Sequence, residues 1–259
     1  MAKVLYAGDS AIMAVLGLEG IEVFSLMDQI WDAGVHLRTA LEAAGHTVTR
    51  LLSHEAYYHL PETAEALAAH DVLILSDIGH DTVMLYPGER RNAVPMGPNR
   101  MKEIVRYVEQ GGGLAYVGGY FTFQGHHGQG RWYGTPVARI LPVEILSLHD
   151  DRIETPEGVR PRVLNADHPV MAGIPWDEPP LFMGYNKTNP RADADLLARI
   201  GDDDDPFIAC GSVGQGRVLA ITSDVAPHWG SGFVKWPHYQ QFWDQAIRWL
   251  SGELGQGRL

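Results

Sequence analysis

One segment, from Asp71 to Asp77, limits the folds available to this chain more than any other. It reads Asp-Val-Leu-Ile-Leu-Ser-Asp, so the residues between the two aspartates are almost all apolar. A strand that is apolar on both faces is typical of the interior of a parallel sheet, where helices cover both sides. We therefore expect this segment to be a central parallel strand.

Strand-like and helix-like segments alternate on both sides of this strand. The expected strands cover residues 3–7, 46–52 and 114–117. The expected helices cover residues 28–45, 62–69 and 99–110. The first of these helices would begin at Asp28 as its N-cap, carry Ile30 and Trp31, and end at Gly45. This order predicts an α/β fold, namely a flavodoxin-like, doubly wound, mostly parallel sheet with helices on both faces.

The second half of the chain is more irregular. Residues from about 141 to 190 are rich in proline and acidic residues and contain only short apolar runs, so we expect a loop-rich insertion there. Segments 206–211 and 216–223 flank a turn and predict a β-hairpin near the C-terminus. A final amphipathic helix is expected at 239–250. The pattern predicts one domain spanning residues 1–259.

The composition excludes several kinds of protein. The chain has 20 Lys and Arg against 32 Asp and Glu, a formal net charge of −12, so a nucleic-acid partner is not expected. No stretch approaches the roughly 18 apolar residues of a membrane span, and the N-terminus lacks the apolar segment of a signal peptide. We therefore expect a cytoplasmic protein that does not bind membranes. The single cysteine, Cys210, excludes an intrachain disulfide framework and a multi-cysteine zinc site.

Polar residues follow several expected strands at the edge where this fold binds ligands. The histidines among them carry most weight, because neutral imidazole can act as acid, base or metal ligand near pH 7. The candidate catalytic residues are His228, Asp224, Gly119 and Tyr120. The candidate ligand-binding residues are Asp9, Asp77, His80, Asp81, Gly118, Gln124, His126, His127 and Trp229. We expect these residues to converge on one cleft.

Each of these features also has a purely structural interpretation. An aspartate after a strand can cap the next helix, and paired glycines can serve a tight turn. His126 and His127, with His80 and His228, could supply imidazoles to Zn²⁺. Adjacent histidines often point apart, so no metal ligand is assigned, and the sequence identifies no cofactor. The aromatic residues in the expected loops suit either a small-molecule ligand or a subunit interface, which leaves a homo-oligomer open.

Four segments carry a resemblance to one protein family. They are residues 72–79, 111–125, 134–144 and 222–230. On these segments the chain resembles bacterial cytoplasmic proteins described as glutamine amidotransferases, within the class I glutamine amidotransferase-like superfamily. The likeness covers nearly the whole chain, including Asp150-Asp151-Arg152 and the tryptophan-rich terminal helix.

In class I glutamine amidotransferases a Gly-x-Cys-x-Gly turn, the nucleophile elbow, presents a cysteine thiolate while backbone N–H groups hold the oxyanion. The resemblance places this elbow at residues 117–121, where Gly119 stands and no cysteine is present. It matches the catalytic histidine to His228, with Gly230 in place of the orienting glutamate. Thiol-dependent hydrolysis of glutamine is therefore not expected, and Cys210 is expected to be a buried core residue. Trehalose-utilisation-like proteins, which also lack the elbow cysteine, show a more distant likeness.

Two functions are compatible with these residues. The first is a small-molecule hydrolase or related acid/base enzyme with a histidine-containing cleft at the strand ends. His228 would act as acid or base, Asp224 or Asp77 would orient it, and the amides of Gly119 and Tyr120 would serve as oxyanion donors. The second is a non-catalytic protein that binds a small, sugar-like molecule or acts as an oligomeric scaffold.

Overall fold

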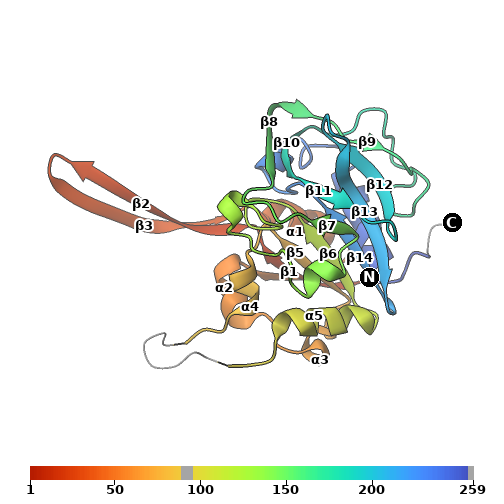
Figure 1. The fold of residues 1–259 in the computed structure, drawn as a ribbon, viewed down its shortest axis with the longest axis horizontal. Coiled ribbons are helices and arrows are strands. Elements are labelled where there is room, and N and C mark those ends of the chain that lie inside the picture. The colour runs from red at the N-terminus through yellow and green to blue at the C-terminus, as the bar shows by residue number, and fades with distance from the viewer. Residues whose placement is uncertain (89–95, 256–259) are drawn as a thin grey trace.

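An eight-stranded sheet forms the centre of the computed structural model (Figure 1). The structure describes residues 1–88 and 96–255; for residues 15–16 and 24–29 it describes the backbone and not the side chains. The strands, in their order across the sheet, are β4 (Thr47–Leu51), β1 (Lys3–Gly8), β5 (Val72–Ser76), β6 (Gly113–Val117), β14 (Gly216–Ile221), β13 (Asp205–Val213), β12 (Asp195–Ile200) and β9 (Arg162–Val163).

The first five of these strands are parallel, and β13 joins β14 by antiparallel pairing. In chain order the parallel strands are arranged 2-1-3-4-5, which is the flavodoxin-like order. The predicted fold class is therefore confirmed, and so is the C-terminal hairpin, whose turn is shorter than expected and centres on Gly214 and Gln215. All five residues of β5 are buried between β1 and β6, as their apolar side chains predict.

Helices cover both faces of the sheet. On one face lie α1 (Val35–Ala43) and α6 (Tyr239–Leu250), and their apolar side chains join one buried core cluster. The other face carries α2 (Ser53–His59), α3 (Ala64–Leu67), α4 (His80–Met84) and α5 (Arg100–Glu109), which contribute to a second cluster. Helix α6 has the predicted bounds, because its apolar residues recur at helical spacing and are buried. No helix in the described part of the chain is both long and apolar enough to cross a membrane.

The expected helix from Asp28 is wrong in its first half. The chain leaves β1 and forms a long antiparallel hairpin of β2 (Ser10–Glu19) and β3 (Glu22–Asp32), which projects from the body in Figure 1. Only then does α1 begin. Ile30 and Trp31, expected on the buried face of a helix, are 58% and 45% exposed. Apolar residues are dense throughout residues 10–32, so their spacing alone does not separate strand from helix.

The region from 141 to 190 contains short strands joined by loops. They are β7 (Val143–Ile145), β8 (Arg152–Val159), β10 (Phe182–Asn186) and β11 (Thr188–Pro190), together with β9 of the main sheet. Strand β10 pairs with β8, and β11 pairs with β7, both antiparallel. The end of β10 lies over the carboxyl ends of two main strands. The main-chain N–H of Asn186 donates to the carbonyl of Thr222, just after β14, at 2.6 Å, and its side chain accepts from the N–H of Gly119, just after β6, at 3.0 Å. The described residues also form short 3₁₀ helices, namely η1 (His126–Gly128), η2 (Val137–Arg139) and η3 (Trp229–Ser231).

Candidate functional site

Three carboxyl groups lie at the carboxyl ends of the parallel strands. Asp9 follows β1, Asp77 follows β5 and Asp224 lies just after β14. Asp9 and Asp224 are each only 2% exposed, and Asp77 is partly buried. Asp9 and Asp77 both have positive φ angles, +43° and +40°, which non-glycine residues adopt at some cost and which are often found at functional sites. These are three of the sequence-predicted residues, and the fold brings them together.

Burial and nearby negative charge favour the protonated forms of Asp9 and Asp77. Burial, and then the charge of Asp224, raise the pKa of Asp9 to about 7. Burial raises the pKa of Asp77 well above its ordinary value, and the charges of Asp224 and Asp9 add to the effect. The hydroxyl of Tyr6 donates to Asp9 Oδ2, while Asp9 Oδ1 is buried without a hydrogen-bond partner. The cluster can therefore hold protons near neutral pH, as acid/base chemistry requires.

The loop at residues 118–121, the elbow of the sequence analysis, wraps around the Asp77 carboxyl. Gly119 has a φ of +143°, and a Cβ placed on it would lie 2.5 Å from Asp77 Oδ1. The N–H of Phe121 donates to the same oxygen at 2.7 Å, and the N–H of Tyr120 also stabilises this carboxylate. The carboxyl of Asp77 thus occupies the space that a nucleophile side chain at position 119 would take.

The expected role of Gly119 as an oxyanion donor needs correction. Its N–H donates to Asn186 Oδ1 at 3.0 Å, and its carbonyl accepts from Asn186 Nδ2 at 3.1 Å. The N–H of Gly118 donates to the carbonyl of Ile221 at 2.8 Å. Both glycine amides are therefore paired inside the protein. Asn186, which the sequence analysis did not select, is fully buried and belongs to the same site.

His228 lies against Asp224 and Tyr120. Its Nδ1 is 3.4 Å from Asp224 Oδ2, and its side chain is 39% exposed. Its ring meets that of Tyr120 edge-on, with centroids 4.6 Å apart. Asp224 also accepts a hydrogen bond from the N–H of Ala226 at 2.8 Å, which fixes the carboxylate. The predicted pairing of a histidine with an orienting carboxylate is present in this geometry.

Tyr120 is surrounded by further polar and aromatic groups. Its hydroxyl donates to Glu154 at 2.9 Å, and the Arg152 guanidinium lies 4.4 Å from its ring centroid. The buried indole of Trp229 donates to the other oxygen of Glu154 at 2.9 Å. The ring of His126 stacks on Tyr120 at 5.7 Å. Arg152 and Glu154 come from β8 and were not predicted. Asp150-Asp151-Arg152 was noted only as part of the family likeness.

A cavity of about 320 Å³ opens beside Asp77. It lies beyond the carboxyl ends of β1 and β5, the neighbouring strands between which this fold reverses strand order and binds ligands. No Lys, Arg or His belongs to the described residues that line it. Those residues are Ser10, Ser53, Asp77, Ile78, Gly79, Asp81, Thr82, Phe121 and Gln129.

A second cavity, of about 500 Å³, is lined by other candidate residues. His80 and Gln124 line it together with Arg131, and His228 lines neither cavity. Asp81 bridges His80 and Arg131, with one oxygen 2.9 Å from His80 Nδ1 and the other 2.9 Å from Arg131 Nη1. The expectation that every candidate residue converges on one cleft is therefore wrong, because the loops after β5 and β6 direct their side chains into separate cavities.

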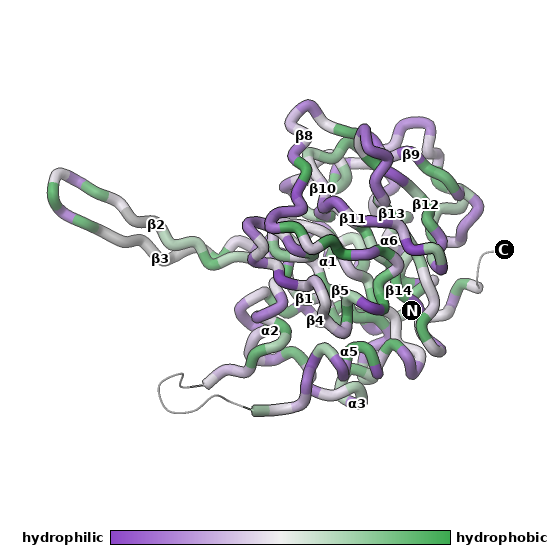
Figure 2. Tube along the Cα trace, viewed as in Figure 1, coloured by the Kyte–Doolittle hydropathy of each residue, from purple (hydrophilic) through white to green (hydrophobic). Residues whose placement is uncertain are grey.

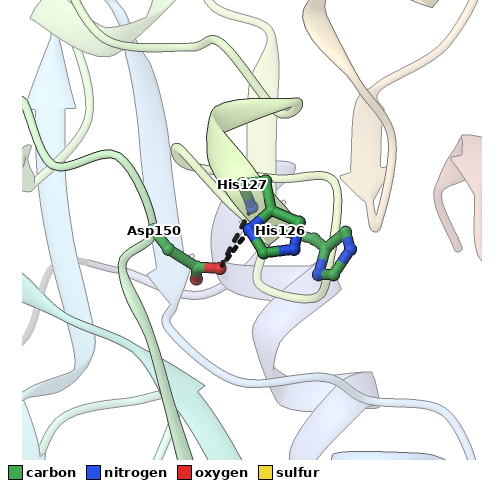
Figure 3. A group of neighbouring side chains, drawn as sticks. All are labelled: His126, His127 and Asp150. Atoms are coloured by element: carbon green, nitrogen blue, oxygen red, sulfur yellow. Dashed lines mark hydrogen bonds and ion pairs between the residues drawn. The ribbon is translucent and has the colours of Figure 1, made fainter.

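His126, His127 and Asp150 form a group whose ligand atoms lie within 4.8 Å of one another (Figure 3). His127 has a φ of +50°, and the two adjacent rings lie with centroids only 4.0 Å apart. The carboxylate of Asp150, however, accepts from Arg152 Nε at 2.9 Å and Nη2 at 2.8 Å. Arg152 holds the pKa of Asp150 well below its ordinary value. The arginine therefore neutralises the carboxylate in place of a metal, and the group fits a cation poorly.

The remaining predicted residues have structural roles. Gln124 donates to the carbonyl of Leu148 at 3.1 Å and accepts from the N–H of Tyr133 at 3.0 Å, which fixes its loop. Cys210 is fully buried in β13, and burial raises the pKa of its thiol well above the ordinary value. The prediction of a core cysteine is confirmed, since a buried, protonated thiol is a poor nucleophile.

Comparison with known proteins identifies relatives of this chain. A family model described as "Putative glutamine amidotransferase" matches residues 3–252. No curated protein matches the chain.

Two solved Salmonella typhimurium structures are similar over almost their whole length. The cytoplasmic protein STM3548 is 32% identical with a TM-score of 0.88, covering 95% of this chain and 98% of its own. The cytoplasmic protein STM1381 of strain LT2 is 31% identical with a TM-score of 0.86, covering 96% and 99%. A ThuA-like protein from Parabacteroides merdae is 12% identical with a TM-score of 0.56, covering 98% and 92%, and shares the fold alone.

Proposed function

Because this chain belongs to the family of putative glutamine amidotransferases, we propose that it uses the family's fold for small-molecule acid/base chemistry that needs no thiol. The observation that carries the proposal is the position of Asp77. Its carboxyl lies at the elbow, where glycine replaces the nucleophile, and it borders a cavity at the switch point of the sheet. A glutaminase of the usual kind would need a thiolate there.

The ligand of this site is a small, neutral, hydroxyl-rich molecule of the sugar or polyol class. Three hydroxyls, from Ser10, Ser53 and Thr82, line the cavity and can exchange hydrogen bonds with such a ligand. Asp77 and Asp81 supply carboxyl groups, and no lining side chain balances a negative ligand. The ring of Phe121 is 40% exposed and offers a surface on which a sugar ring can stack.

Two groups have the chemistry for proton transfer. Asp77, whose pKa is raised, can donate a proton to an oxygen of the ligand, and the elbow amides then stabilise the carboxylate that remains. His228 lies outside this cavity, so the role of acid or base expected for it, with Asp224 orienting it, applies to a ligand that extends beyond the cavity to its ring. The reaction class supported best is hydrolysis or a related proton-dependent step on a neutral substrate.

The second candidate function is binding without catalysis. It is favoured by the internal pairing of the Gly118 and Gly119 amides, which leaves neither of these donors for a developing oxyanion. In either case we propose that the chain acts in the cytoplasm, as the names of the two Salmonella proteins state for them, and that residues 1–259 work as one domain.

A ligand panel tests the proposal. The purified protein would be screened by thermal shift and calorimetry against neutral sugars, polyols, amides and sugar phosphates, with turnover followed in parallel. We expect binding of a neutral sugar or polyol that Asp77→Asn removes and that Asp203→Asn, a change at an exposed carboxylate, leaves intact. Turnover lost in His228→Ala with binding retained supports the enzyme, and binding without turnover supports the second candidate. Binding restricted to anionic compounds would contradict both.

Glutamine provides a separate test of the thiol. We expect no ammonia release above a heat-denatured control, from the wild type and from Cys210→Ser alike, because the only thiol is buried and protonated. Ammonia release abolished by Cys210→Ser would overturn the thiol-independent proposal.

A further inference from the structure

The hairpin of β2 and β3, called the arm from here on, leaves apolar side chains without cover. Figure 2 shows it extending from the body with apolar segments near its base and at its tip. A two-stranded ribbon on its own is marginally stable in water, and clustered exposed apolar residues mark interaction sites. The exposed apolar residues of the arm, with their exposed fractions, are Ile12 52%, Met13 51%, Leu18 73%, Ile21 93%, Val23 62%, Ile30 58% and Trp31 45%.

A groove of matching character lies close to the base of the same arm. It has a volume of about 460 Å³ and runs along α1, between that helix and the segment that leads into and begins α6. Helix α1 begins at Val35, directly after β3 ends at Asp32, so the groove starts where the arm leaves the body. The residues that line it are Val35, His36, Thr39, Ala40, Ala43, Val234, Trp236, Pro237, Tyr239 and Gln240.

The charges of the two surfaces are complementary. The tip of the arm carries Glu19 and Glu22, one at each side of the turn. At the groove, exposed Lys235 lies between two of the lining residues, Val234 and Trp236. Among the described residues, none of Glu19, Glu22 and Lys235 forms an ion pair within the chain. In a protein of net charge −12, a lysine without an ion pair beside an apolar groove is suited to an acidic, apolar partner such as this tip.

We propose that two copies of this chain form a dimer in which each arm places its tip in the partner's groove. A strand of ten residues spans about 34 Å at roughly 3.4 Å per residue. Since each groove lies at the base of an arm, a two-fold axis can set the arms side by side in opposite directions, with each tip at the other's base. Such a contact is isologous and closes on itself, as dimer interfaces do. This inference does not depend on the proposed function.

Sedimentation equilibrium or light scattering of the full chain tests the proposal. We expect a dimer at micromolar concentration. The double variant Leu18→Glu/Ile21→Glu and the groove variant Ala40→Glu should each raise the dissociation constant about tenfold or more, equivalent to about 1.4 kcal/mol. Leu164→Glu, a change at a 43% exposed leucine away from the arm, is the matched control and should leave it unchanged. Circular dichroism checks that each variant is folded.

Charge exchange and crosslinking identify the contact itself. Glu19→Lys/Glu22→Lys and Lys235→Glu should each weaken the dimer, and the triple variant should restore it. Because Cys210 is buried, Ile21→Cys with Lys235→Cys should form an interchain disulfide under mild oxidation that neither single variant forms. A monomeric wild type would overturn the proposal. So would a dimer whose dissociation constant is unchanged by both the arm and the groove substitutions.

Discussion

Gly119 has a backbone conformation that suits glycine, and its Cα lies against the Asp77 carboxyl. We expect Gly119→Ala to lower the free energy of unfolding by about 2–4 kcal/mol, because the new Cβ adds a collision to the conformational strain. Gly134→Ala is the matched control: its φ is +75°, but nothing lies within 4 Å of the added Cβ. Only the strain, about 1 kcal/mol, should be measured there by urea unfolding. Equal losses in the two variants would show that Asp77 does not fill the elbow.

Asp9 makes stability depend on pH in a defined direction. Its pKa is about 7 in the folded protein against an ordinary value of 3.8, so the folded state binds the proton more tightly. The stabilisation is fully present below about pH 4 and is lost as the pH rises through 7. Asp9→Asn can still accept from Tyr6 but does not titrate. Its loss of unfolding free energy between pH 5 and pH 8 should be about 2–3 kcal/mol smaller than that of the wild type. An identical loss in both proteins would contradict the raised pKa.

Among individual site residues, the sequence predicted those that follow the parallel strands. It missed those that come from the insertion at residues 141–190. Asp9, Asp77 and Asp224 were found because the carboxyl ends of parallel strands meet at one edge of a sheet. Asn186 and Arg152 reach the same place through β10 and β8, whose position over the sheet depends on tertiary packing. The sequence shows Arg152 directly after two aspartates. This pattern alone does not predict that β8 brings the arginine to the ends of the parallel strands.

The buried side-chain amide of Asn186 connects β10 to the elbow. Asn186 pairs with both backbone groups of Gly119 and donates to Asp151 at 3.0 Å. We expect Asn186→Ala to cost about 2–4 kcal/mol, since it leaves buried polar groups unpaired. Asn189→Ala, an exposed change in the next strand, should stay within about 0.5 kcal/mol. Chemical denaturation measures both, and similar small effects would mean that β10 is held by its other contacts.

Elements whose burial pattern is regular were predicted well, and the arm was not. Helix α6 has the expected bounds because one face is apolar and its partner is the sheet. The base of the arm contacts α2 through Ser10 and Ser53, and the seven apolar residues given above are exposed in the described part of the chain. The sequence of the arm carries neither a clear helical nor a clear alternating pattern. These exposed apolar residues underlie the proposed dimer contact.

Across the whole molecule, we expect the local stability of the sheet to differ from that of the arm. Strands β1, β5, β6 and β14 are hydrogen-bonded on both sides and buried, so their amides should exchange with solvent only on global unfolding. In the Leu18→Glu/Ile21→Glu variant the arm amides should exchange far faster than those of the sheet. In the wild-type dimer they should be slowed. Hydrogen exchange with mass spectrometry measures this difference, and equally fast arm exchange in both proteins would contradict protection by a partner.

The carboxyl of Asp77 at the elbow also bears on how such proteins are detected. Reagents that mark glutamine amidotransferases carry an electrophile, which alkylates the elbow cysteine. Here the electrophile would meet a glycine with a carboxyl packed against it, and the only thiol lies inside the sheet. Surveys that count active amidotransferases by covalent labelling would therefore pass over this chain. The lack of labelling would follow from the chemistry of the reagent, which needs an accessible thiol. The cavity beside Asp77 would still be open to a ligand that binds without a covalent bond.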